Sequence, residues 1–91
     1  MTGMQWTEQE GGKGYECIVP PLAEGLRHSE MRTYPSSREG WSWYVYLAAP
    51  GTWYELSGYG CATEGKARFM AMSAASALLQ IIDGVKPHEV D

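Results

Sequence analysis

WSWYVYLAAPGTWYELSGYG, residues 41–60, holds three of the four tryptophans and four of the six tyrosines of this 91-residue chain. Aromatic and β-branched side chains favour β-strands, and a Pro-Gly pair such as Pro50-Gly51 favours a tight turn. The stretch therefore predicts an antiparallel hairpin. Its first strand is expected over 41–48 and its second over 53–62.

Side chains along a strand alternate between its two faces, and neither face of the first strand carries a charge. One face is expected to present Trp41, Trp43, Val45 and Leu47, and the other Ser42, Tyr44, Tyr46 and Ala48. In the second strand, Gly58 and Gly60 are expected on the same face as Leu56. There they leave room for a bulky ring or for another backbone.

The segment that follows, TEGKARFMAMSAASALLQIIDG (63–84), predicts a helix. Thr63 is a suitable N-cap, Glu64 suits the positive end of the helix, and Gly84 is a natural stop. Apolar residues spaced by three and four form the expected core-facing stripe, which is Ala67, Met70, Ala71, Ala74, Leu78 and Ile81. Its small side chains allow the helix to pack closely on one face of the hairpin. The pattern leaves open which face that is.

The N-terminal half predicts further strands. Segments 4–9 and 15–19 read as a second hairpin, which Pro20-Pro21 ends. Segment 26–34 fits a strand or a short helix, and Pro35 after it favours the strand. The expected fold is thus α+β, a four- to five-stranded antiparallel meander with one C-terminal helix packed on one face. We expect residues 1–91 to form a single domain, with 1–3 and 85–91 as flexible ends.

The chain carries a net charge of −4, which argues against a general nucleic-acid binder. A local basic group, Arg27, His28, Arg32 and Arg38, is interrupted by Glu30 and Glu39. The N-terminus has no signal-peptide pattern, and no apolar run is long enough to cross a bilayer. We therefore expect a reduced cytoplasmic protein with no membrane contact. A disulfide between Cys17 and Cys61 is possible only if their strands are neighbours.

No pattern for catalysis or cofactor binding stands out. The two histidines, His28 and His88, lie far apart in the sequence and have no nearby nucleophile at a recognisable spacing. With the two cysteines they do not form a metal-ligand pattern, and the glycine-rich stretches match no phosphate loop. We expect a protein that is not an enzyme, with no catalytic residue, no metal and no cofactor.

The features that point to function are apolar and aromatic surfaces. The helix is uncharged from Phe69 to Ile82, and beyond its core stripe it carries a second one of Phe69, Met72, Leu79 and Ile82. Exposed apolar surface usually marks an interaction site, although the loop 20–27 could cover this stripe instead. Tyr44 and Tyr46 are the second candidate, because one helix covers only one face of the sheet.

The order of W-x-W-x-V, a Pro-Gly turn, a strand ending in G-C-A-T and an Ala-rich helix resembles small uncharacterised phage and prophage proteins over residues 41–83. This resemblance implies a small cytoplasmic accessory protein that binds a host protein, as inhibitors of host systems do. The strand-G-C-x-T-helix stretch is also similar to HicB-type antitoxins, which have a partial RNase-H-like fold. The chain departs from them because it lacks their acidic run before the helix and an appended DNA-binding segment.

Two hypotheses for function remain. The first is a protein-interaction module that forms a homodimer through its helix or binds a host protein; Leu79→Asp should then abolish association and leave the fold intact. The second is a single-stranded nucleic-acid binder that stacks bases on sheet aromatics beside Arg27, Arg32 and Arg38.

Overall fold

The computed structural model describes residues 6–18, 23–36, 40–82 and 86–87. The elements within these ranges are β1 (Thr7–Glu8), a 3-10 turn (Glu10–Gly12), β2 (Tyr15–Ile18), β3 (Ala23–Glu24), β4 (His28–Pro35), β5 (Trp41–Ala49), β6 (Thr52–Cys61), α1 (Glu64–Leu79) and β7 (Lys86–Pro87). The expected end of a strand at Pro20-Pro21, the stop at Gly84 and most of the expected flexible ends lie outside the described residues.

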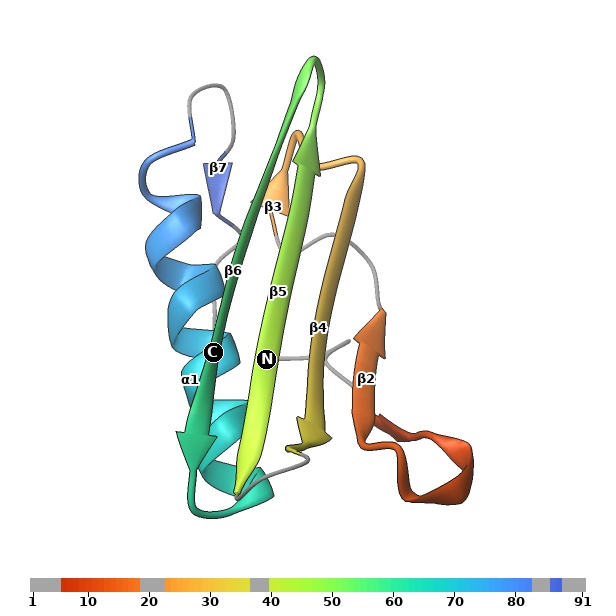
Figure 1. Cartoon of the computed structure of the whole chain (residues 1–91). Coiled ribbons are helices and arrows are strands. Elements are labelled where there is room, and N and C mark those ends of the chain that lie inside the picture. The colour runs from red at the N-terminus through yellow and green to blue at the C-terminus, as the bar shows by residue number, and fades with distance from the viewer. Residues whose placement is uncertain (1–5, 19–22, 37–39, 83–85, 88–91) are drawn as a thin grey trace.

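Five strands form one antiparallel sheet in the order β1-β2-β4-β5-β6, and α1 packs against one of its faces (Figure 1). The expected α+β meander is confirmed, including both hairpins and the strand reading of segment 26–34. The sequence did not indicate the short pairing of β3 with β7, which forms a separate two-stranded sheet. No helix in the described part of the chain has the length and apolar character to span a membrane.

The central hairpin of β5 and β6 turns at Pro50-Gly51, as predicted, where Gly51 adopts a φ of 80°. Near its other end the register shifts, because Trp43 lies opposite Gly58 whereas Trp41 lies opposite Cys61. One extra residue is therefore accommodated in β6, next to Gly60 at a φ of 83°. The bulge interrupts the strict alternation on which the expectation for Gly60 rests, because Cys61 and not Gly60 lies opposite Trp41.

Gly58 has the role predicted for it, since it makes room for a ring. A Cβ atom at this position would lie 2.5 Å from Nε1 of Trp43. Trp43 is buried together with Val45, Leu47 and Ala49, so the face of β5 toward α1 is the tryptophan face. Met31 of β4 and Cys17 of β2 extend this buried layer across the sheet.

The helix begins as predicted, with the Thr63 hydroxyl accepting a 3.1 Å hydrogen bond from the backbone N–H of Lys66. Its buried stripe consists of Ala67, Ala71, Ala75, Leu78 and Leu79, and Ile82 follows it into the core. The expected core position Ile81 is wrong, since this side chain is 68% exposed. The chain tightens where Gln80 and Ile81 donate to carbonyls three residues back, which turns Ile82 inward instead.

Candidate functional site

The candidate site is the face of the sheet that α1 leaves uncovered, which we call the open face. Strand alternation and register place its side chains in rows that run across the sheet. One row is Glu16, Arg32, Tyr44 and Ser57, the next contains Glu30, Tyr46 and Glu55, and a third is His28, Ala48 and Trp53. Tyr44 and Tyr46, both predicted as partner-binding residues, thus lie on the open face, and each is partly buried by its neighbours.

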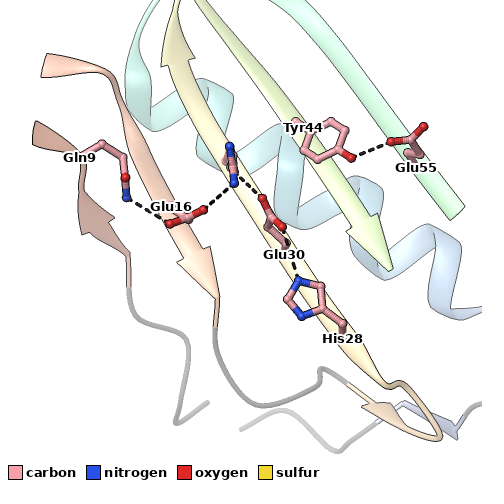
Figure 2. Close-up of polar contacts among 7 residues, drawn as sticks. Gln9, Glu16, His28, Glu30, Tyr44 and Glu55 are labelled. Atoms are coloured by element: carbon pink, nitrogen blue, oxygen red, sulfur yellow. Dashed lines mark hydrogen bonds and ion pairs between the residues drawn. The ribbon is translucent and has the colours of Figure 1, made fainter. Parts of the chain in front are cut away.

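A chain of polar contacts crosses the open face from Gln9, which directly follows β1, to β4 (Figure 2). The amide nitrogen of Gln9 donates to Oε1 of Glu16 at 3.2 Å, and Nη2 of Arg32 lies 2.9 Å from Oε2 of the same carboxylate. Nε of Arg32 pairs with Oε2 of Glu30, whose other oxygen is 3.4 Å from Nε2 of His28. The Arg32 guanidinium is thus held between two carboxylates.

A second polar contact joins the two strands of the central hairpin. The Tyr44 hydroxyl donates a 2.6 Å hydrogen bond to Oε2 of Glu55 (Figure 2). This hydrogen bond, partial burial and the negative charges of Glu55 and Glu30 together raise the pKa of Tyr44 to about 12. Tyr44 therefore remains a neutral hydrogen-bonding group throughout the physiological pH range.

Three rings lie side by side at the end of the open face nearest the Pro50-Gly51 turn. The Tyr46 ring is 6.0 Å from the His28 ring and 6.1 Å from the Trp53 ring, measured between centroids, and both pairs are tilted. Trp53 is 58% exposed, so the group presents an accessible indole beside the Tyr46 ring, which has the His28 ring as its other neighbour.

The opposite end of the open face is hollowed beside β2. A depression of about 670 Å³ lies there, and its polar lining includes Gln9, Lys13, Glu16, Arg32, Tyr34 and Tyr44. The ion pair of Arg32 and Glu16 belongs to this lining. The open face therefore combines an aromatic end with a charged and hollowed end, which suits it to bind a surface of mixed character.

The second apolar stripe expected on the helix is not a continuous surface. Phe69 is 61% exposed and Met72 is also exposed, as predicted. Leu79 and Ile82 are buried, which corrects the prediction that they are available to a partner. Leu26, from the segment suggested as a possible cover, belongs to the same buried cluster as these two side chains. Of the four residues of the expected stripe, only Phe69 and Met72 are exposed.

Sequence reasoning did not identify the charged part of the open face. In the sequence Glu30 stands only as an interruption of a basic group, whereas in the structure it links Arg32 and His28. The signal was present in the alternation of His28, Glu30 and Arg32, which share one face once segment 26–34 is a strand. Glu16 and Glu55 could not be added without knowing which strands pair.

The described residues give little support to a metal site, to a disulfide or to nucleic-acid binding. No group of three or more potential ligands that could hold a metal ion occurs within 6–18, 23–36, 40–82 and 86–87. Cys17 and Cys61 are buried thiols on β2 and β6, with β4 and β5 between them, so no disulfide joins them. Of the arginines suggested for nucleic-acid binding, Arg32 is neutralised by carboxylates, and Arg38 lies outside the described residues.

Comparisons of the chain with models of protein families, with curated proteins and with solved structures found no match.

Proposed function

We propose that the protein is a non-enzymatic interaction module whose open face binds another protein. The observation that carries this proposal is the uncovered sheet face, on which exposed and half-buried rings lie beside ordered charges. Tyrosine, tryptophan and arginine are the residues most enriched at protein–protein interfaces. The contacts that hold Arg32 and Tyr44 in place also reduce the side-chain entropy lost on binding.

The charges of the open face indicate the kind of partner. Glu16, Glu30 and Glu55 supply three carboxylates, whereas Arg32 is the one guanidinium that contacts any of them in the described structure. A partner surface with cationic groups around an apolar centre would complement this arrangement. The same excess of carboxylates repels phosphates and disfavours the alternative of single-stranded nucleic-acid binding. In keeping with its sequence resemblance, we infer a cytoplasmic accessory protein of the phage or prophage type that acts on a host protein.

The test compares two variants that each remove one ring. Tyr46→Ser alters the open face, and Phe69→Ser alters an exposed ring on α1. Proteins captured from a host lysate by the wild type are purified and titrated against both variants. The affinity should fall about tenfold or more for Tyr46→Ser and stay unchanged for Phe69→Ser.

Two results would contradict the proposal. One is a captured protein that binds both variants as tightly as the wild type, because the open face then takes no part. The other is loss of binding with Phe69→Ser alone, which would move the site to the helix. Short oligonucleotides at low salt provide a separate check, and we expect them to leave the tryptophan fluorescence of the protein unquenched.

A further inference from the structure

The two edges of the sheet are protected very differently. One edge is β1, which is two residues long. The other is β6, which runs for ten residues from Thr52 to Cys61 and has a described neighbour only on its β5 side (Figure 1). Proteins usually protect long edge strands with lysine, proline or a covering segment. β6 contains neither of these residues, Glu55 is its only charged one, and its bulge lies at the far end, beyond residues 53–59. It therefore presents a backbone that another strand can pair with.

The register identifies the backbone groups on this free edge. Ala49 and Thr52 flank a two-residue turn and so form a hydrogen-bonded pair, after which bonded and non-bonded pairs alternate. In agreement, the Ala48 carbonyl points away from β6 and accepts a 2.7 Å hydrogen bond from the N–H of Arg27. The N–H and C=O groups of Trp53, Glu55 and Ser57 therefore point outward from the sheet.

The sequence of this edge is complementary to itself. Two copies can pair antiparallel only if outward-pointing residues face one another. A two-fold axis at Glu55 would place the two Glu55 carboxylates opposite each other, which is unfavourable. An axis at Leu56 places Glu55 opposite Ser57 of the second copy and Trp53 opposite Tyr59. It also pairs residues 53–59 without interruption, ending just before the bulge at Gly60.

The same register fills a gap on the covered side of the sheet. An apolar hollow beside the edge is lined by Trp43, Gly58, Tyr59, Gly60, Lys66 and Met70, among others. With the axis at Leu56, Tyr54 of the second copy lies opposite Gly58, on the side of the sheet that faces this hollow. An aromatic side chain opposite a strand glycine is a favourable pairing, because it covers the backbone that glycine leaves bare.

We propose that the protein forms a two-fold symmetric dimer by antiparallel pairing of its β6 edges, centred on Leu56. The two five-stranded sheets then form one continuous sheet, with both α1 helices on one side and both open faces on the other. The proposal is independent of the proposed function, because the ring removed in that test, Tyr46, lies on β5 and not on this edge.

A cysteine at the axis provides the sharpest test. In a non-hydrogen-bonded antiparallel pair the two Cα atoms lie about 4.5 Å apart, within the range that a disulfide can span. Leu56→Cys should therefore give a covalent dimer under mild oxidation, seen on a non-reducing gel. Ser57→Cys is the matched control, because its partner across the interface is Glu55 and the two new thiols are offset. The wild type supplies the baseline, as both native cysteines are buried. Equal cross-linking of the two variants, or none in Leu56→Cys, would overturn the proposal.

A charge exchange tests the register without a covalent bond. Ser57→Lys places an ammonium group opposite Glu55 of the second copy, whereas Ser57→Glu places a carboxylate there. Sedimentation equilibrium should show a dissociation constant lower than the wild type for Ser57→Lys and roughly fivefold higher for Ser57→Glu. Glu55→Lys combined with Ser57→Glu should restore association. Two results would refute this pairing. One is a wild type that is monomeric at every concentration, and the other is an equal change of the dissociation constant in Ser57→Lys and Ser57→Glu.

Discussion

Met31 and Val45 lie opposite each other on the face of the sheet that α1 covers, and both are almost fully buried. The neighbouring pair consists of Glu30, which precedes Met31, and Tyr46, which follows Val45. This pair lies on the open face. The same two strands thus build an apolar layer and a polar, aromatic layer from alternating residues. Whether a residue of these two strands lies in the apolar or the polar layer depends on whether its position along the strand is odd or even. The layer in turn decides whether its substitution disturbs the core or the surface.

On the covered face the stabilising factor is the fit of shapes. Alanines of α1 lie against the sheet at buried positions, and the Trp43 ring occupies the space beside Gly58. On the open face, charges and rings are matched in pairs, and each member keeps some contact with solvent. Substitutions should therefore affect folding on the covered face and recognition on the open face.

The largest expected effect separates a buried from an exposed position on the same helix. Leu79→Asp places a charge where only 8% of the side chain is exposed, and should cost at least about 3 kcal/mol of unfolding free energy. Phe69→Asp, on the solvent side of α1, should cost less than about 1 kcal/mol. Urea denaturation followed by circular dichroism measures both. If the Leu79→Asp variant stays folded and only loses self-association, Leu79 lies on the protein surface. The helix would then again be a candidate interface.

The next effect tests the fit of shapes at one position. Gly58→Ala brings a methyl group against the Trp43 ring and should destabilise the fold by about 1–3 kcal/mol. Ser57→Ala, one residue away on the open face, should change stability by less than about 0.5 kcal/mol. In a Trp43→Phe background, which lacks the indole nitrogen, the cost of Gly58→Ala should fall by at least about 0.5 kcal/mol. Additive costs would show that the ring and the glycine do not constrain each other.

Much of this architecture could be predicted because its signals are local. The Pro50-Gly51 turn, the Thr63 cap and the alternation in 41–48 each depend on neighbouring residues, and all three are confirmed. The placement of Tyr44 and Tyr46 on one face follows from the same alternation. Their role in binding a partner remains a prediction.

What could not be predicted depends on distant partners. Leu79 and Ile82 are buried in one cluster with Leu26, a residue more than fifty positions earlier in the chain, and the sequence of α1 carries no local signal of that cluster. The bulge at Gly60 depends on how β6 meets Trp41. The pairing of Arg32 with Glu16 needs the β2–β4 register, for which the sequence carries no local signal.

The smallest expected effect concerns one proton on the open face. The pKa of Tyr44 is raised to about 12 from its ordinary value of 10.0, mainly because its hydroxyl donates to Glu55. The folded state holds this proton more tightly than the unfolded state, so the stabilisation is complete below pH 10. It declines as the pH rises from about 10 to about 12, where the unfolded chain releases the proton first.

Two variants isolate this effect from the other tyrosines. Tyr44→Phe removes the titrating group, so its unfolding free energy should fall less steeply than that of the wild type over this alkaline window. Glu55→Gln keeps a hydrogen-bond acceptor but removes the charge, and should narrow the window by lowering the pKa of Tyr44. Urea titrations at closely spaced pH values measure both slopes. Identical slopes in the wild type and Tyr44→Phe would mean that the hydrogen bond to Glu55 is not maintained in solution, and the open face would then depend on Arg32 and its two carboxylates for its order.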